Sequence, residues 1–198
     1  MTHGGRGTLP TPAADAPKRA WRRWARAVRG AWAEGPGRAD DESAIAAHLA
    51  DWPAWVAACT VLAYLPFGDE VAPPLDLEGK TVLTTRTDAD ARRLTLHRAD
   101  GPLERHPLGF LQPPTDAPEA DPGSVDLVLV PGLAFDRRGG RIGYGRGLYD
   151  GLLPTLPAGA PRVAVAIDAW VVGQLPLEAH DVRVTHLLTP SGVRAVDH

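Results

Sequence analysis

The sequence contains a single cysteine, Cys59, among 198 residues, and no apolar run approaches the roughly 18 residues needed to span a bilayer. A lone cysteine excludes an internal disulfide and a zinc site built from several cysteines, and it fits a reducing compartment. We expect Cys59 to be a small buried side chain. Because the first 20 residues also lack the apolar stretch of a secretory signal, we expect a cytoplasmic protein without a membrane partner.

Glycine and proline number 21 and 20 residues, which together stay below the roughly 25–30% of low-complexity chains. The hydrophobic fraction of 44% is too high for a chain that is disordered throughout. At this length, one domain buries roughly 70% of the surface that its unfolded chain exposes. We therefore expect a monomer with one domain over residues 18–198, preceded by a disordered leader at residues 1–17 that is rich in Gly, Thr, Pro and Ala.

The net charge of −3 conceals an uneven distribution along the chain. Six cations and no acid lie between residues 18 and 29, so the other residues sum to −9. Those cations are Lys18, Arg19, Arg22, Arg23, Arg26 and Arg29. Such a basic patch on an otherwise acidic protein predicts an anionic ligand, which could be a nucleic acid, a membrane surface or a small polyphosphate.

The basic patch lies on a predicted amphipathic helix over residues 18–33. Three tryptophans in this segment share the apolar face of the helix: Trp21, Trp24 and Trp32. Packing against the core accounts for them better than stacking on bases does. A helix that binds nucleic acid is therefore the weaker alternative.

After these residues the apolar period changes toward that of strands. We expect a second helix to begin at Asp40 or Asp41, whose carboxylates suit an N-cap, and to run through residue 52. The expected strands cover residues 60–66, 80–86, 92–98, 125–131, 162–168 and 182–189. This order predicts a single α/β domain with a central mixed or parallel sheet flanked by helices. The six prolines of residues 101–123 predict a long extended connection that can line a site.

The densest functional signal is the segment after the predicted strand that ends at residue 131. Glycines at 143, 145 and 147 allow consecutive backbone N–H groups to form a concave site for phosphate oxygens. We call residues 143–147 the glycine loop. Within it, Arg146 can bind a phosphate through its forked guanidinium, and a short helix is expected to follow at residues 148–153. Asp136 and Asp150 supply the hard oxygens that Mg²⁺ prefers.

The spacing of the glycine loop matches neither the dinucleotide fingerprint nor the P-loop, and alone it fits a Gly-rich surface loop equally well. The wider segment, however, resembles the signature of the 5-formyltetrahydrofolate cyclo-ligase family, also called methenyltetrahydrofolate synthetases. The resemblance rests on P-G-x-x-F-D at residues 131–136, Gly139, Arg141 and G-x-G-x-G-x-Y-D at residues 143–150. Three further motifs follow the family's order: K-x-x-x-R at 18–22, Y-x-P-x-x-x-E-V at 64–71, and L-P followed by H-D-V at 175–182.

That family uses ATP and Mg²⁺ to convert 5-formyltetrahydrofolate to 5,10-methenyltetrahydrofolate with release of ADP and phosphate, and the resemblance implies the same activity here. It implies catalytic roles for Glu70 and Arg146, and metal ligation by Asp150 and Asp181. It places the substrate against Leu65, Glu70, Tyr144, Gly145, Arg146, Gly147 and Leu148. It places ATP against Lys18, Arg19, Ala20, Trp21, Arg22, Arg141, Ile142, Gly143, Tyr144, Gly145, Arg146, Gly147, Leu148 and Tyr149.

Three departures from the family pattern leave a second interpretation open. Leu148 and Gly151 replace a tyrosine and a basic residue that many members carry, and Pro73 and Pro74 interrupt what is usually a longer helix. These changes leave intact the part of the site that would bind the nucleotide. They concern the part of the site that would bind the folate. The alternative is a divergent ATP-binding paralogue that acts on another folate- or thiamine-related substrate.

Overall fold

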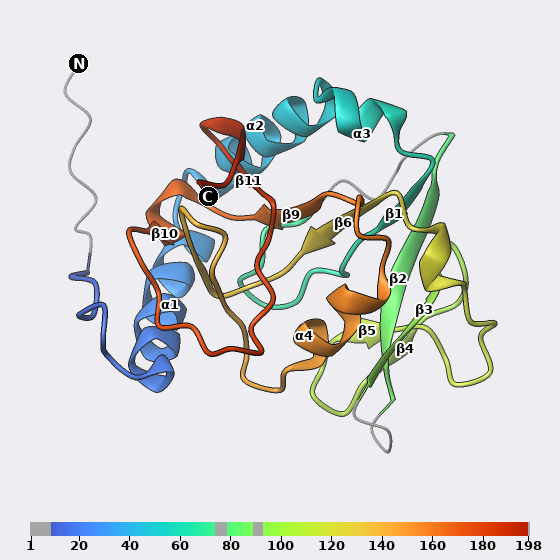
Figure 1. The fold of residues 1–198 in the computed structure, drawn as a ribbon, viewed down its shortest axis with the longest axis horizontal. Helices are drawn as coiled ribbons and strands as arrows, with labels where there is room; N and C mark the ends of the chain where they lie inside the picture. Colours follow the sequence, from blue (N-terminus) through green and yellow to red (C-terminus); the bar gives the residue numbers. More distant parts are fainter. Residues whose placement is uncertain (1–8, 74–78, 89–92, 198) are drawn as a thin grey trace.

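The computed structural model describes residues 9–73, 79–88 and 93–197 (Figure 1). Its centre is a seven-stranded sheet in the order β12-β11-β9-β6-β1-β2-β3. The five inner strands run parallel, and each edge strand is antiparallel to its neighbour. The strands are β1 (Thr60–Leu62), β2 (Thr81–Asp88), β3 (Arg93–Arg98), β6 (Leu127–Val130), β9 (Arg162–Val165), β11 (His186–Thr189) and β12 (Gly192–Ala195). The predicted α/β class is confirmed.

Strand β6 lies at the middle of this sheet because it is apolar at every position. All four of its side chains are buried, as expected for a parallel strand covered on both faces. Val128 pairs with Leu62 of β1, and Leu129 pairs with Val163 of β9. The chain leaves β1 toward β2 on one side and leaves β6 toward β9 on the other, so the sheet order reverses between β1 and β6. In open parallel sheets, such a reversal marks the usual place of a ligand site.

The helices are α1 (Lys18–Ala33), α2 (Arg38–Ala50), α3 (Pro53–Ala57) and α4 (Leu148–Leu152), with 3₁₀ turns at Pro122–Ser124, Leu153–Thr155 and Asp168–Trp170. The predicted start of α2 is wrong, because Asp40 and Asp41 lie in its first turn, where carboxylates favour the helix dipole without capping the end. The helix ends at Ala50, two residues before the predicted end at residue 52. Pro53 then starts α3, because proline fits a first helical turn and not an interior.

A smaller second core attaches α1 to a three-stranded sheet made of β10 (Val171–Val172), β7 (Ala134–Asp136) and β8 (Arg141–Ile142). Trp21, Trp24 and Ala25 pack there with residues of β7 and β8. The prediction that the tryptophans of α1 belong to a core is confirmed, since Trp21, Trp24 and Trp32 are only 2%, 8% and 7% exposed. This packing fixes α1 beside the strand that leads into the glycine loop.

The proline-rich connection over residues 101–123 is more ordered than its sequence predicts. It contains a short hairpin of β4 (Glu104–Arg105) and β5 (Leu111–Gln112). Between these strands, the ring of Phe110 stacks on His106 at 4.2 Å and meets the edge of Phe67 at 6.1 Å. The hairpin is thereby tied to the chain that follows β1.

Two smaller expectations turn out differently, and the expected leader stays a prediction. Cys59 is exposed and not buried, because it lies just before β1 begins. The expected strand at 60–66 pairs only as far as Leu62. Of the expected leader, residues 1–8 lie outside the described residues, whereas Leu9 accepts a hydrogen bond of 3.2 Å from the Trp24 indole. Pro74, one of the two prolines expected to interrupt a helix, also lies outside the described residues. Among the described residues, no helix is long and apolar enough to cross a membrane.

Candidate functional site

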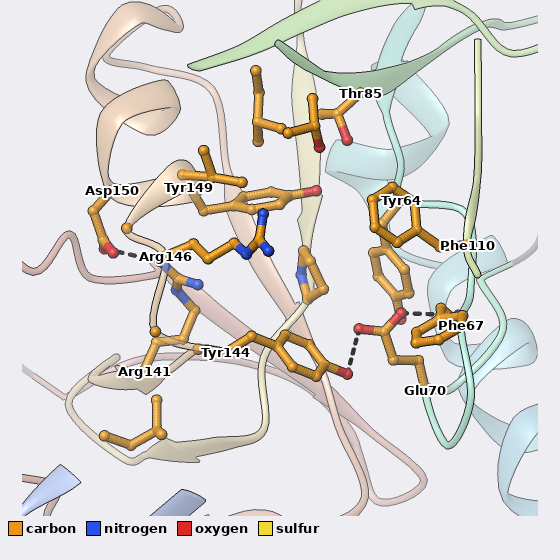
Figure 2. A pocket seen from close by; sticks show the side chains of 18 of the residues that line it. Tyr64, Phe67, Glu70, Thr85, Phe110, Arg141, Tyr144, Arg146, Tyr149 and Asp150 are labelled. Atoms are coloured by element: carbon orange, nitrogen blue, oxygen red, sulfur yellow. Dashed lines mark hydrogen bonds and ion pairs between the residues drawn. The ribbon is translucent and has the colours of Figure 1, made fainter. Parts of the chain in front are cut away.

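A pocket of about 620 Å³ lies beside the reversal of the sheet order, in the size range of small-molecule sites. Residues that follow β1 and β6 enter it directly, including Tyr64, Leu65 and Pro131. Further walls come from the glycine loop, α1, the β4–β5 hairpin, strands β2 and β3, and residues 178–181. The prediction that the connection over residues 101–123 lines a site is therefore confirmed. Figure 2 shows side chains from these separate segments pointing toward one another.

Helix α1 presents one row of cations to the pocket. Lys18, Arg22 and Arg26 recur every four residues and line it together, as residues on one helical face do. Arg19, Ala20 and Trp21 are not among the lining residues, although the resemblance places ATP against them. Their proposed contact with ATP stays a prediction, and the Trp21 side chain belongs to the second core.

Arg29 differs from the other cations of the basic patch because it is a buried structural group. It is 1% exposed and donates hydrogen bonds to Asp69 Oδ1 at 3.1 Å and to the Gly132 carbonyl at 2.7 Å. Its guanidinium also lies over the Trp170 ring, 4.3 Å from the centroid. The expectation that all six cations face an anionic ligand is therefore wrong for Arg29, whose anionic partner is the Asp69 side chain.

The glycine loop bends tightly against Arg22. The Arg22 Nε donates a hydrogen bond of 3.0 Å to the Gly143 carbonyl. Gly145 adopts φ +100°, and a Cβ placed there would lie 3.2 Å from Cζ of Arg22. The positive φ favours glycine, and an added Cβ would also push the Arg22 guanidinium away by a few tenths of an ångström. Next to it, Arg146 is exposed and extends toward the middle of the pocket (Figure 2).

Two acidic side chains in the pocket are already paired with cations. Asp150 accepts a hydrogen bond of 2.8 Å from Arg141, and Asp181 accepts bonds of 2.6 and 2.9 Å from Lys18. Burial raises the pKa of Asp181, but hydrogen bonds from the Glu178 N–H and Lys18 outweigh burial and hold that pKa below its usual value. The Asp181 carboxylate is therefore held in its anionic form.

No group of three or more His, Cys, Asp or Glu residues among the described ones could hold a metal ion by itself. Mg²⁺, however, is commonly bound by one or two carboxylates together with substrate phosphates and water. Asp150 and Asp181 fit that pattern, since both line the same pocket as the phosphate-binding candidates.

Asp136, which the sequence offered as a second magnesium ligand beside Asp150, does not line the pocket. It is 1% exposed, and its carboxylate accepts hydrogen bonds from the backbone N–H groups of Arg138, Gly140 and Leu175 at 2.7–3.0 Å. These donors close the turn after β7. The proposed role of Asp136 in metal binding is wrong, because its oxygens serve the backbone instead.

The wall made by residues 64–70 carries a buried acid, Glu70. Its Oε2 accepts a hydrogen bond of 3.0 Å from the Phe67 N–H, and its Oε1 accepts one of 3.1 Å from the Tyr144 hydroxyl (Figure 2). Burial raises the pKa of Glu70, although these two hydrogen bonds and the Arg29 charge act in the opposite direction. Burial also raises the pKa of Tyr144, so its hydroxyl remains a donor at neutral pH.

Several pocket residues escaped the sequence reasoning. Strand β2 supplies Thr84, Thr85 and Thr87, and the hairpin supplies Leu108 and Phe110. For Thr85 and Thr87 the alternation of β2 was a usable signal, because every second residue of a strand faces the same side. Nothing in the sequence placed the hairpin over this pocket, since its contacts with the chain after β1 are tertiary.

Comparisons with known proteins point to one family. A model of the 5-formyltetrahydrofolate cyclo-ligase family matches residues 14–190. A 5-formyltetrahydrofolate cyclo-ligase from Mycolicibacterium smegmatis is 37% identical over 142 residues, which cover 66% of this chain and 73% of that protein. The protein of the same name from Escherichia coli is 30% identical over 158 residues, covering 75% and 87%. The solved structure of 5,10-methenyltetrahydrofolate synthetase from Aquifex aeolicus matches with a TM-score of 0.74 at 26% identity, covering 91% of this chain and 93% of that one.

Proposed function

The chain belongs to the 5-formyltetrahydrofolate cyclo-ligase family, and on this premise we propose that it converts 5-formyltetrahydrofolate to 5,10-methenyltetrahydrofolate with ATP and Mg²⁺. The products released are ADP and phosphate. One observation carries the proposal: a single pocket is lined both by the cations and glycines suited to phosphates and by the buried carboxylate of Glu70. We also propose that the protein acts as a cytoplasmic monomer.

The proposed reaction must activate the formyl oxygen, because an N-formyl group is an amide and its oxygen is a poor leaving group. That oxygen attacks the γ-phosphorus of ATP, the bond from this phosphorus to the bridging oxygen breaks, and ADP leaves. The nitrogen at position 10 then bonds to the formyl carbon and loses its proton. Finally, the carbon–oxygen bond breaks and phosphate departs with the former formyl oxygen, which leaves the carbon joined to both nitrogens.

Phosphoryl transfer of this kind is catalysed mainly by positioning and by stabilising negative charge. In the proposal, Lys18, Arg22 and the glycine loop bind the phosphates. Arg146 stabilises the charge that develops on the transferred group. Asp150 and Asp181 hold Mg²⁺, which neutralises phosphate charge when it is bound.

The other half of the pocket is proposed to hold the folate. Leu65, Phe67 and Phe110 give it apolar surface, and Glu70 offers a carboxylate to N–H donors of the substrate. The glycine loop contributes Tyr144 and Leu148 to the same pocket. Tyr144 thus supplies an aromatic ring close to where Leu148 departs from the family pattern.

A helix that binds nucleic acid receives no support from these contacts. Bases stack on exposed aromatic faces, whereas the three tryptophans of α1 are all buried. Three of its six cations line the pocket, and Arg29 is used internally.

The proposal is tested by mixing the purified protein with MgATP and 5-formyltetrahydrofolate and following the absorbance of the methenyl product. A reaction without ATP serves as the control for spontaneous cyclisation, and both the monoglutamate and a polyglutamate form are tried. ATP-dependent product formation is the expected result. If ATP raises the melting temperature while neither folate is turned over, the divergent paralogue replaces this assignment.

A further inference from the structure

Two ion pairs join the charged side chains in the polar part of the pocket. Lys18 Nζ lies 2.6 Å from Asp181 Oδ2, and their side chains are 16% and 10% exposed. Arg141 Nη2 lies 2.8 Å from Asp150 Oδ1, and those side chains are 7% and 19% exposed. All four residues line the pocket. Lys18 and Arg141, two of the cations assigned to ATP, are therefore each already bound to a carboxylate assigned to the metal.

We propose that these two pairs make the pocket select the magnesium complex of a nucleotide over the free polyphosphate. Lys18 and Arg141 exchange Asp181 and Asp150 for phosphate oxygens only when a divalent cation arrives to take the carboxylates. Asp150 and Asp181 thus act as internal competitors of the phosphates as well as metal ligands. This inference rests on the proposed function, because it assumes that the pocket binds ATP.

The charges explain why a metal-free polyphosphate binds poorly. If it captured Lys18, it would leave the Asp181 carboxylate, which is largely shielded from water, without its cation. That carboxylate would also face a polyanion, and like charges repel strongly where water is excluded. The same argument applies to Arg141 and Asp150.

A divalent cation without phosphate meets the converse obstacle. To bind Asp181 and Asp150, it would displace the Lys18 ammonium and the Arg141 guanidinium. Lys18 would keep only the water-exposed Glu178, 3.5 Å away, and among the described residues Arg141 would keep no carboxylate partner. When the metal and the polyphosphate arrive together, the two carboxylates pair with the metal and the two cations pair with phosphate oxygens, so no charge loses its partner. The exchange of partners is therefore favourable only for the complex of metal and polyphosphate, and the binding of the metal is coupled to the binding of the polyphosphate.

The remaining cations of the pocket do not impose this requirement. Arg22 donates its Nε hydrogen bond to a neutral backbone carbonyl, that of Gly143. In the part of the chain that the structure describes, Arg146 has no hydrogen bond or ion pair. Phosphate can therefore approach Arg22 and Arg146 without releasing a carboxylate. The preference for the metal complex is therefore assigned to two ion pairs alone, Lys18 with Asp181 and Arg141 with Asp150.

The test measures ATP binding by calorimetry in excess Mg²⁺ and, separately, in excess EDTA, for the wild type and for Asp181→Asn. The wild type is expected to bind ATP at least about tenfold more weakly in EDTA, within the range usual for coupling between two bound groups. In Asp181→Asn, Lys18 is released, so the affinity for metal-free ATP rises several-fold and the ratio between the two conditions shrinks.

Glu178→Gln is the matched control. Glu178 also lies near Lys18, at 3.5 Å, but it is 60% exposed and therefore screened by water. Its substitution is expected to leave the ratio unchanged. Should Asp181→Asn unfold, as judged by near-UV circular dichroism, Asp150→Asn tests the second pair in the same way.

The outcomes separate this inference from the proposed function. If Asp181→Asn weakens binding of MgATP and leaves metal-free binding unchanged, Asp181 is a metal ligand only and the inference is overturned. Equal binding of ATP by the wild type in Mg²⁺ and in EDTA also overturns it, while the proposed function stands. If ATP binds under neither condition, the proposed function fails, and the inference fails with it.

Discussion

The Tyr144 hydroxyl donates a hydrogen bond of 3.1 Å to Oε1 of Glu70, and this contact joins the glycine loop to the segment that follows β1. The two residues are 74 positions apart in sequence, and both line the pocket. In the proposed function, Tyr144 belongs to the loop that binds the phosphates and also supplies an aromatic ring to the folate half, where Glu70 lies. The contact therefore links the phosphate-binding loop to the folate half of the site.

Tyr144→Phe is expected to change the pH dependence of the reaction. The Tyr144 hydroxyl stabilises ionised Glu70 and so counters the effect of burial on its pKa. Without that hydroxyl the pKa of Glu70 rises further, and the acid limb of kcat/KM moves to higher pH. We also expect kcat/KM at neutral pH to fall about fivefold, the equivalent of one hydrogen bond.

Tyr64→Phe is the control for this experiment. The Tyr64 hydroxyl donates to the Val71 carbonyl at 2.6 Å and not to Glu70, so its loss should leave the acid limb in place. Steady-state rates across the acid range distinguish the two variants. A limb that stays fixed in Tyr144→Phe would show that Tyr144 does not control the ionisation of Glu70.

Glu70→Gln is expected to make the protein more stable and less active. Burial raises the pKa of Glu70, so the folded protein holds this proton more tightly than the unfolded chain does. The contribution of Glu70 to stability is therefore largest below its ordinary pKa and is lost as pH rises through the raised pKa of the folded state. At pH 7 the neutral amide removes the cost of the buried charge.

The free energy of unfolding of Glu70→Gln should exceed that of the wild type at neutral pH by about 0.5–2 kcal/mol, the range usual for single stabilising changes. The gain should vanish near pH 4, at about the ordinary pKa of the glutamate side chain. Urea denaturation at both pH values measures it, and the exposed Glu178→Gln should change stability little at either. A loss of stability at neutral pH would contradict this assignment of the buried charge.

The sequence predicted those parts of the fold where a local pattern decides the outcome. The continuous apolar run of β6 predicted a strand buried on both faces, and the spacing of the tryptophans predicted which face of α1 is inside. The glycine loop and the short helix after it were also predicted, because a glycine changes the conformations open to its own backbone and this effect can be read from the sequence. In these segments, local preference and tertiary packing agree.

What the sequence could not predict depends on contacts between distant segments. Asp136 has the chemistry of a metal ligand, and only the closure of the turn after β7 and the approach of Leu175 show that its oxygens are already used. Arg29 belongs to a basic run by sequence, but the Gly132 carbonyl and Trp170 make it part of the interior. The contact between Tyr144 and Glu70 likewise has no local signal.

Arg146→Ala is expected to reduce kcat by about 10²–10³-fold, the usual effect of removing one group that stabilises developing charge. The Arg146 side chain is exposed and points into the pocket, so its removal should not affect folding (Figure 2). Arg23→Ala removes an equally exposed arginine of α1 that does not line the pocket, and it should retain full activity. Equal activity of both variants in single-turnover assays would exclude a catalytic role for Arg146.

Gly145→Ala is expected to weaken ATP binding about tenfold or more, because it disturbs the loop in two ways. Gly145 has φ +100°, which an L side chain rarely adopts, and the new Cβ would lie 3.2 Å from Cζ of Arg22. Relief of either strain displaces the Arg22 guanidinium from the Gly143 carbonyl and moves a proposed phosphate ligand. A misplacement of about 1 Å in a positioning group can cost 10²-fold in rate.

Gly151→Ala provides the matched control in the neighbouring helix. Gly151 lies within α4, its φ is not positive, and a Cβ there would meet nothing within 4 Å. Alanine should therefore leave ATP affinity unchanged and raise stability by roughly 0.4–1 kcal/mol, because it restricts the unfolded chain. Calorimetric titration with MgATP and thermal unfolding of both variants make the comparison. If the two alanines weakened binding equally, the loss would reflect the helix as a whole and not the conformation of Gly145.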